Sequence, residues 1–419
     1  MEITRAAAGM WGGNQIQVAG EDKSVGLREY VLHRGRFEGS ALAKDGGPWF
    51  AKVDCLQREI ESAGGNWRSF SHYDYAGLAS HPKVIAAAKE AIDLQGPGVG
   101  ASRLVGGERL AQERFEKDLA EFVGADAALS LISGYLTNYS LIPHLIGKRD
   151  LIVYDELCHN SLLMGIAASG ATAIAVSHND LAQMNSILVE HRQNHRKCLI
   201  IVEGLYSMDG DIPDLPEILD LKQRHDCWLM VDEAHSIGVL GKTGRGISEH
   251  FGTNPKDIDL LIGTLSKTFV SAGGFIAADV EVIWYLRYSL GGFVYSVGPP
   301  PASTASAHAA LEILREEPER VERLRQNSCY FLNACRRSGI DTGNASGYAV
   351  IPAYQPDYQT AFILGDALLA HGIYVPPVVH VGVPKSKPRL RFFISEKHCA
   401  SDFDAVLDAM AHILRPAAE

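Results

Sequence analysis

Two apolar segments of the sequence, residues 228–231 and 258–262, each end abruptly in polar side chains that could do chemistry. Such runs predict buried parallel strands, and ligands of open α/β sheets bind beyond the carboxyl ends of the strands. The first run is followed by an acid and an imidazole, and the second by two hydroxyls and a lysine: Asp232, His235, Thr264, Ser266 and Lys267. A lysine can form a Schiff base with an aldehyde, a carboxylate can keep a pyridine nitrogen protonated, and hydroxyls can hold a phosphate. The pattern therefore predicts a site for a pyridine aldehyde cofactor.

The sequence around these residues is longer and more specific than a short pattern. It contains VDEAHSIGVLG and GRG within residues 231–246, and GTLSK at residues 263–267. Both motifs resemble those of the α-oxoamine synthases, which have the type I, or aspartate-aminotransferase, fold of pyridoxal 5′-phosphate (PLP) enzymes. The resemblance covers roughly residues 47–415, with motifs in the expected order. It implies an α/β fold: a PLP-dependent transferase with a large domain on a mainly parallel, seven-stranded-type sheet and a small α+β C-terminal domain.

The resemblance assigns catalytic roles to four residues. Lys267 carries the Schiff base and exchanges the Cα proton of the substrate, and Asp232 keeps the ring nitrogen protonated. His159, in DELCHNS, matches the histidine that stacks on the ring, and His235 lies near the phenolic oxygen of the ring. We expect burial to lower the pKa of Lys267 and keep its amine partly neutral. We do not expect Cys158 to act as a nucleophile with His159, because adjacent residues of a strand face opposite sides.

Further candidates would hold the cofactor and its phosphate. Residues 127–133 are typical of a strand that breaks at Gly134 into a helix, and a helix start presents free amides to an anion, although many such turns only connect elements. In the family, this turn binds the phosphate of the cofactor. A segment with hydroxyl side chains from the partner subunit adds a further contact to the phosphate, and Ser296 is the candidate for it in this sequence. The cofactor-binding set is therefore Gly134, Tyr135, His159, Glu203, Ser207, Asp232, His235, Thr264, Ser266, Lys267 and Ser296.

Two residues are substrate-binding candidates by the same resemblance. Arg391 matches the arginine that grips the α-carboxylate of the amino acid; the alternative is a strand arginine whose stem packs on the sheet. The family pairs this arginine with an asparagine, and Asp74 stands in that place here. An ionised Asp74 would repel the carboxylate, so either Asp74 is protonated or turned toward a cation, or the amino acid is not the usual glycine, alanine or serine. Gln112, for a usual histidine, and Val297, for a usual hydroxyl residue, are further departures.

The composition limits the classes of function. The 419 residues carry a formal net charge of −11, which leaves no basic surplus for binding nucleic acid. The seven cysteines are scattered and form no C-x-x-C pair, so we expect free thiols, a reducing compartment and no metal site. No segment reaches 18 apolar residues without a charge, and the N-terminus lacks a signal-peptide pattern. These features predict a soluble, cytoplasmic protein without stable membrane insertion.

The order of the patterns predicts three regions. Residues 1–75 form an N-terminal extension with short strands, whose first part has no assigned role. Residues 76–303 form the large PLP-binding α/β domain, and residues 304–419 form the small α+β domain. One long helix over about residues 304–338 should link the two domains, because tandem prolines precede it.

Local patterns predict the elements within these regions. Short strands are expected at 47–54 and 66–75, helices at 82–94 and 110–123, and an antiparallel strand at 273–279. The regular alternation with helices predicts parallel strands at residues 151–155, 172–177, 198–203, 228–232 and 260–263.

Taken together, these assignments predict a PLP-dependent C-acyltransferase. It would join an amino acid to an acyl thioester, carried by CoA or by an acyl-carrier protein, and give an α-aminoketone, CO₂ and the free thiol. Activities like those of serine palmitoyltransferase or 8-amino-7-oxononanoate synthase fit, and the family resemblance implies a homodimeric biosynthetic enzyme with its site between subunits. The alternatives are another type I PLP enzyme, of the aldolase or decarboxylase kind, or an inactive regulatory subunit, against which Lys267 argues. The amino acid and the acyl chain length cannot be predicted.

Overall fold

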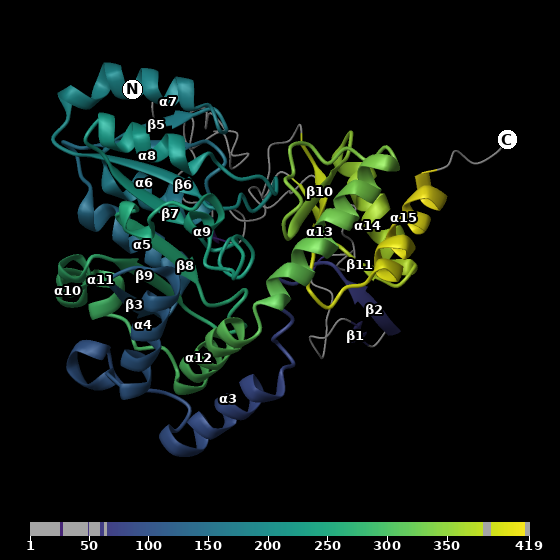
Figure 1. Cartoon of the computed structure of the whole chain (residues 1–419), viewed down its shortest axis with the longest axis horizontal. Helices are drawn as coiled ribbons and strands as arrows, with labels where there is room; N and C mark the ends of the chain where they lie inside the picture. Colours follow the sequence, from purple (N-terminus) through teal and green to yellow (C-terminus); the bar gives the residue numbers. More distant parts are fainter. Residues whose placement is uncertain (1–25, 28–48, 50–58, 63–64, 380–386, 415–419) are drawn as a thin grey trace.

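The computed structural model describes residues 26–27, 49, 59–62, 65–379 and 387–414 of the chain. These residues form two lobes (Figure 1). The larger lobe holds a seven-stranded sheet; the smaller lobe holds two three-stranded sheets with α13 (Glu319–Arg337), α14 (Tyr358–Ala370) and α15 (Ala400–Leu414). The strand predicted at 47–54 lies outside the described residues except for Trp49.

The large sheet confirms the predicted α/β architecture. Its strands are β3 (Ala127–Leu131), β4 (Leu151–Asp155), β5 (Thr172–Val176), β6 (Cys198–Glu203), β7 (Trp228–Asp232), β8 (Leu260–Thr264) and β9 (Gly274–Ala278). They lie in the order β3-β9-β8-β7-β6-β4-β5. The strands β5, β4, β6, β7 and β8 pair in parallel, and β9 runs antiparallel to both of its neighbours, as the sequence predicts.

Helices cover both faces of this sheet, because its central strands bury side chains on both faces. In β6, Ile200 and Val202 enter one core cluster, while Leu199 and Ile201 enter the other. The helices of this lobe are α3 (Pro82–Gln95), α4 (Leu110–Val123), α5 (Gly134–Leu145), α6 (Asn160–Ser169), α7 (Leu181–His191), α8 (Leu215–Arg224), α9 (Ile247–Phe251), α10 (Val280–Ser289), α11 (Gly291–Val294) and α12 (Pro301–Glu316). The helices predicted at 82–94 and 110–123 are confirmed as α3 and α4.

The single linking helix predicted over residues 304–338 is wrong. The chain forms two helices there, α12 and α13, which are separated by Glu317 and Pro318. Glu317 has φ −125° and ψ 60°, because a proline disfavours the helical conformation of the residue before it. Since α12 packs on α3 and α4, while α13 packs on α15 and β10 (Val350–Tyr354), these contacts favour a domain boundary near residue 317 rather than 304.

The small lobe combines strands from both ends of the chain. β10 and β12 (Pro377–Val378) pair antiparallel with β13 (Arg389–Phe393). In the other sheet, β1 (Glu59–Ser62) pairs with β2 (Gly65–Ser69), and β2 pairs in parallel with β11 (Ile373–Tyr374). The strand predicted at 66–75 therefore ends at Ser69, and the chain after it turns toward the larger lobe.

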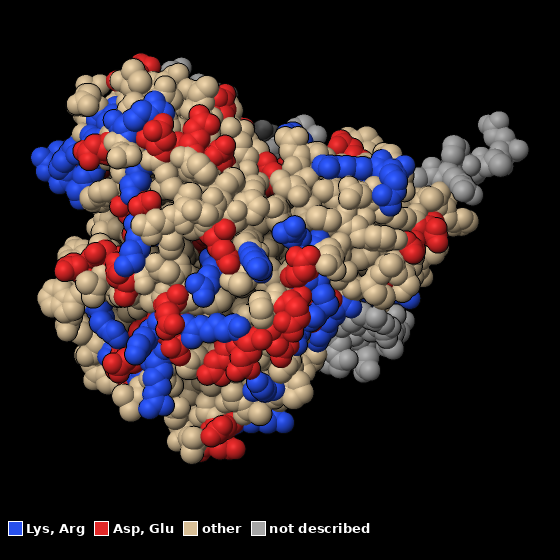
Figure 2. Space-filling model, in the orientation of Figure 1, with Lys and Arg blue, Asp and Glu red and all other residues tan. Residues whose placement is uncertain are grey.

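The surface mixes charges of both signs. On the face drawn in Figure 2, acidic and basic side chains are interspersed over both lobes. The negative net charge is therefore not concentrated in one patch on this face. Among the helices in the described part of the chain, none has the length and apolar character that a membrane span requires.

The lobes meet closely at Gly210, in the loop after β6. Gly210 has φ +71°, its N–H donates to the Tyr206 carbonyl (2.9 Å), and its carbonyl accepts from the Ser346 N–H (2.9 Å) of the small lobe. A Cβ built on Gly210 would overlap the carbonyl oxygen of Val350 in β10. Only glycine therefore fits this junction without displacing β10.

We expect Gly210→Ala to lower the free energy of unfolding by about 3 kcal/mol, because it adds both backbone strain and a steric overlap. Denaturant unfolding followed by circular dichroism measures the change. Gly147→Ala is the matched control, since a Cβ at Gly147 meets nothing within 4 Å and its φ is not positive. Equal stability of the two variants would contradict the prediction.

Candidate active site

A cavity of about 490 Å³ opens where β7 and β8 end, which is the edge at which open α/β sheets bind ligands. Eleven of the thirteen residues predicted for the site line this cavity, and two, Asp74 and Ser296, do not. The lining residues are Gly134, Tyr135, His159, Glu203, Ser207, Asp232, His235, Thr264, Ser266, Lys267 and Arg391. The structure thus brings together side chains that lie far apart in the sequence.

Lys267 follows β8 and directs its amine into the cavity. Burial lowers the pKa of this amine to about 8, although the carboxylates of Asp232 and Glu203 oppose the shift. Within the described residues, no hydrogen-bond partner holds the Nζ atom, which lies 5.6 Å from the centroid of the Tyr73 ring. The lysine is therefore an available nucleophile and proton carrier near neutral pH.

Asp232 is the last residue of β7, and two donors fix its buried carboxylate. Its Oδ2 accepts from Asn138 Nδ2 (2.8 Å), and its Oδ1 accepts from the Ala234 N–H (3.0 Å). Asn138 also donates to Ser161 Oγ (2.9 Å), and its own Oδ1 is buried without a partner among the described residues. The sequence analysis missed Asn138; its signal is a polar side chain one helical turn after Gly134, on the inner face of α5.

His159 and Glu203 are linked at the floor of the cavity. The His159 N–H donates to Glu203 Oε1 (2.6 Å), and the Ser207 N–H donates to Glu203 Oε2 (3.2 Å). Burial, together with the nearby Asp232, raises the pKa of Glu203 to about 8. The Nδ1 atom of His159 lies 2.8 Å from Ser161 Oγ. Burial lowers the pKa of His159, so its imidazole is neutral at pH 7. Glu203 thus positions two loops that carry site residues.

The neighbouring Cys158 takes no part in this arrangement. It lies in the turn between β4 and α6, so the argument that strand alternation turns Cys158 away from His159 is wrong. Cys158 is instead excluded as a nucleophile by its burial. The thiol contacts the Ile201 carbonyl (3.7 Å), and burial raises the pKa of the thiol well above the usual range. Such a thiol does not form a thiolate at neutral pH.

His235 is held by a residue that the sequence analysis did not single out. The Tyr75 hydroxyl lies 2.6 Å from His235 Nδ1, and both side chains are buried. Burial lowers the pKa of His235 well below its usual range, so the ring is neutral. The rings of Tyr73 and Phe393 lie 5.9 Å and 6.2 Å from the His235 ring. His235 is therefore packed among aromatic rings, one of which, Phe393, belongs to β13 of the small lobe.

The N-terminus of α5 provides an anion site opposite these groups. Ser133 caps the helix, and Gly134 and Tyr135 occupy its first turn, where backbone N–H groups have no partner within the helix. Thr264 Oγ1 and Ser266 Oγ lie 2.8 Å apart beside this turn. A Cβ on Gly134 would lie 2.9 Å from Thr264 Oγ1, so glycine allows β8 and α5 to approach this closely.

These residues fit PLP. An available lysine amine suits its aldehyde, the fixed carboxylate of Asp232 suits its ring nitrogen, and the helix start with two hydroxyls suits its phosphate. The unpartnered Oδ1 of Asn138 points to a further polar group in the cavity. The donors and acceptors thus match the cofactor at three separate points.

Arg391 enters the cavity from β13 of the small lobe. Its Nη1 donates to the Ser207 carbonyl (2.8 Å), and its guanidinium lies 4.4 Å above the Phe393 ring. The predicted pairing with Asp74 is absent, because the Asp74 carboxylate accepts from the N–H groups of Leu78 (2.6 Å) and Ala79 (3.0 Å). Asp74 therefore fixes a turn, and it is not aimed at a substrate carboxylate at Arg391.

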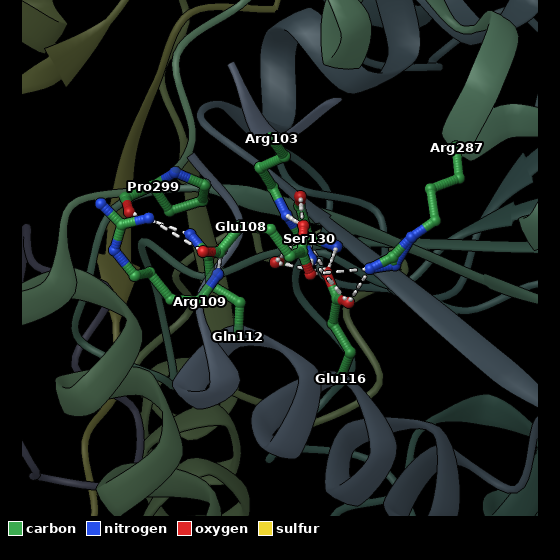
Figure 3. Close-up of polar contacts among 8 residues, drawn as sticks. All are labelled: Arg103, Glu108, Arg109, Gln112, Glu116, Ser130, Arg287 and Pro299. Atoms are coloured by element: carbon green, nitrogen blue, oxygen red, sulfur yellow. Dashed lines mark hydrogen bonds and ion pairs between the residues drawn. The ribbon is translucent and has the colours of Figure 1, made fainter. Parts of the chain in front are cut away.

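Ser296 lies in a segment that contacts the loop before α4, in which Ser102 lies. Val297 forms a β-bridge with Ser102. Gln112 donates from Nε2 to the Pro299 carbonyl (3.2 Å), as Figure 3 shows. The Oε1 atom of Gln112 accepts from the Arg109 N–H (3.1 Å). Gln112 is thus buried and hydrogen-bonded, and it ties the segment of Ser296 to the start of α4.

A buried ion network supports the same loop. The Arg103 guanidinium pairs with Glu116 and with Glu108 (2.6 Å), and it donates to the Ser130 carbonyl (3.2 Å) (Figure 3). Arg287, from α10, reaches Glu108 (2.9 Å) from the other side. Because removing one member would leave buried charges unpaired, this network holds the loop in place.

Comparisons with known proteins agree with this geometry. The family model described as aminotransferase class I and II matches residues 66–408. The 8-amino-7-oxononanoate synthase of Fervidobacterium nodosum is 40% identical over 362 residues, which cover 84% of this chain and 91% of the relative. The serine palmitoyltransferase of Bacteroides ovatus is 34% identical over 387 residues, which cover 92% of this chain and 98% of the relative.

Solved structures are similar as well. A structure of SPT with PLP has a TM-score of 0.88 at 27% identity and covers 93% of this chain and 98% of its own. The serine palmitoyltransferase of Sphingomonas wittichii has a TM-score of 0.87 at 28% identity, with the same coverage of 93% and 98%.

The lowered pKa of Lys267 predicts a pH-dependent cost of burying its charge. In the cofactor-free protein, we expect Lys267→Met to be more stable than wild type at pH 7 by up to about 3 kcal/mol. The unfolded lysine holds its proton up to about pH 10.5 and the folded one only to about 8, so wild type should gain stability as the pH rises between these values. The difference between the two proteins should therefore shrink over that range.

Urea unfolding at several pH values measures this difference. Lys148→Met, at an exposed lysine, is the control and should show no such change with pH. A constant gap between Lys267→Met and wild type from pH 7 to pH 10 would contradict the prediction.

Proposed function

This chain belongs to the aminotransferase class I and II family of PLP enzymes, and from that membership we propose how its own residues serve an α-oxoamine synthase. The enzyme is an acyltransferase that uses PLP to condense an amino acid with an acyl thioester. The products are an α-aminoketone, CO₂ and the free thiol. The observation that carries the residue assignment is the meeting of the Lys267 amine, the Asp232 carboxylate and Arg391 in one cavity.

Lys267 and Asp232 act on two different protons. Bound PLP supplies an electron sink that makes a carbanion at the amino acid Cα accessible. Lys267 Nζ, with its pKa near 8, takes the Cα proton and later returns one to the product carbon. Asp232, held by Asn138 and Ala234, keeps the ring nitrogen protonated. The new bond joins Cα to the acyl carbonyl carbon, the thiolate leaves, and the carboxyl group leaves as CO₂.

The remaining residues hold the reactants. Gly134, Tyr135, Thr264 and Ser266 bind the phosphate of the cofactor, and Arg391 binds the α-carboxylate of the amino acid. His159 would pack against the ring of bound PLP, and Glu203 fixes the loop of His159 through its backbone N–H. Ser207 and His235 would hold the phenolic oxygen of bound PLP, and His235 is itself held by Tyr75. Neutral histidines are suited to donate a hydrogen bond without placing a second positive charge beside Lys267.

The first test is a visible spectrum of the purified protein, titrated with each of the twenty amino acids. We expect a cofactor band that disappears in Lys267→Ala and that shifts with the true amino acid substrate. Release of free thiol from an acyl thioester then distinguishes acyl transfer from an aldolase-like or decarboxylase-like reaction. A colourless protein that PLP cannot reconstitute would overturn the proposal in favour of an inactive regulatory subunit.

We also propose a homodimer in which Ser296 reaches the cofactor phosphate of the partner subunit. Tyr295 is 90% exposed and Val105, in the adjoining loop, is 76% exposed, while Val297 and Leu104 are about half exposed. Apolar side chains grouped in this way favour an interface between subunits. Their position next to Ser296 supports a site that the partner completes. We place this enzyme in the cytoplasm, because its seven cysteines are scattered along the sequence and form no C-x-x-C pair.

Val105→Asp should convert the dimer to a monomer and weaken PLP binding, because it puts a charge into the proposed interface. Light scattering after gel filtration measures the mass, and titration of the apoprotein measures PLP affinity. Val189→Asp, at a 67% exposed valine of α7, is the matched control and should change neither. A monomeric wild type with full PLP affinity would refute the shared site.

A further inference from the structure

A chain of hydrogen bonds connects Asp232 with His159 along the cavity. Asn138 Nδ2 donates to Asp232 Oδ2 (2.8 Å) and to Ser161 Oγ (2.9 Å), and Ser161 Oγ lies 2.8 Å from His159 Nδ1. Asn138, Ser161 and Asp232 are buried, and all four residues line the cavity. The acid assigned to the ring nitrogen of the cofactor is therefore joined to the histidine assigned to its ring face.

Close packing of two helices brings Asn138 and Ser161 together. Asn138 lies in α5, and Ser161 lies in the first turn of α6. Gly165 follows Ser161 by one helical turn, and a Cβ built on it would lie 2.7 Å from the Asn138 carbonyl oxygen. Glycine at this position thus allows α6 to approach α5 closely, and the two polar side chains meet across the contact.

The carboxylate of Asp232 fixes the direction of these hydrogen bonds. A carboxylate only accepts, so the amide of Asn138 turns its NH₂ group toward Asp232. The same NH₂ group also donates to Ser161 Oγ, which leaves the hydroxyl hydrogen of Ser161 free to donate to His159 Nδ1. Asn138 Oδ1 is buried without a partner among the described residues, so only the NH₂ group holds this side chain in the chain.

Two donors of Ser161 decide which nitrogen of His159 carries the proton. His159 is the N-cap of α6, and its Nδ1 accepts from the backbone N–H of Ser161 (3.2 Å) as well as facing the hydroxyl. A backbone N–H can only donate, so Nδ1 carries no hydrogen. The one N–H of the neutral imidazole is therefore at Nε2.

The surroundings of His159 keep the imidazole neutral. Burial lowers its pKa, the positive charges of Lys267 and Arg391 act in the same direction, and the carboxylate of Asp232 opposes them. Glu203 accepts from the backbone N–H of His159 and not from its ring. The choice between the two neutral tautomers is therefore left to the contacts at Nδ1.

We propose that Asn138 and Ser161 are positioning residues that hold His159 in its Nε2–H tautomer and couple its ring to the Asp232 carboxylate. This inference rests on the proposed function and deepens it, because it fixes the orientation of the histidine that would pack on the cofactor. A flipped ring would turn a C–H toward Ser161 and lose both contacts at Nδ1.

The test reads the His159 ring in the purified full-length protein. Long-range ¹H–¹⁵N NMR spectra of protein labelled with ¹⁵N in its histidines distinguish the two tautomers, and His159→Gln identifies the resonances of His159. We expect the Nε2–H tautomer in wild type. Ser161→Ala removes one donor to Nδ1, and Asn138→Leu removes the amide that orients this donor. Each change should lower the ratio of Nε2–H to Nδ1–H tautomers about 10-fold.

Asn138→Leu is the more telling variant, because Asn138 makes no hydrogen bond to His159 in the part of the chain that the structure describes. The double variant should change the tautomer ratio no more than Ser161→Ala alone, since both substitutions act at one bond. Ser169→Ala is the matched control: this serine of α6 bonds the Ile166 carbonyl, outside the cavity, and the ratio should stay unchanged.

A wild-type His159 with its hydrogen at Nδ1, or an unchanged ratio in Ser161→Ala, would overturn the inference. Additive effects in the double variant would overturn the coupling through Ser161. If Asn138→Leu does not fold, the result for Ser161→Ala decides alone. These spectra need no cofactor, whereas failure of the wild-type protein to take up PLP would refute the proposed function itself, so the two failures are distinguishable.

Discussion

The site depends on the burial of one lysine amine, which has no hydrogen-bond partner in the part of the chain that the structure describes. Desolvation would make a charged Lys267 costly, and the carboxylates of Asp232 and Glu203 offset part of that cost, so its pKa settles near 8. Burial and the nearby Asp232 raise the pKa of Glu203, and Asn138 holds the Asp232 carboxylate by a hydrogen bond. The parallel order of β6, β7 and β8 places these groups side by side. A different strand order would separate the acid from the amine.

Much of this arrangement could be predicted from the sequence. Continuous apolar runs that end in polar residues indicated the parallel strands, and their ends placed Asp232, Thr264 and Lys267 at one edge of the sheet. The direction of side chains in a turn could not be predicted in this way. The position of Asp74 in a motif suggested that it pairs with Arg391. Its carboxylate instead accepts hydrogen bonds from two backbone N–H groups, and this arrangement depends on the geometry of the turn. The side chain in the cavity is that of its neighbour Tyr73.

The site also depends on a contact between lobes that no local pattern reveals. Alternate residues of β13 share a face, so Arg389 and Arg391 both reach the loop after β6. Arg391 donates to the Ser207 carbonyl (2.8 Å), while Arg389 donates to the Met208 carbonyl (2.9 Å) and pairs with Asp209 (2.9 Å). The small lobe is thereby fixed to the loop that carries Ser207 into the cavity.

The other end of this loop is fixed to the large sheet. His178 bridges Asp211 (2.8 Å) and Asp155 (2.9 Å), the last residue of β4. Burial alone would lower the pKa of His178, but the two carboxylates raise it to about 10, so the bridge stays charged at neutral pH. One end of this loop is therefore held by Arg389 and Arg391 of β13, and the other end by the ion pairs of His178. Because Arg391 of β13 donates to the Ser207 carbonyl of this loop, the position of its guanidinium in the cavity depends on both lobes.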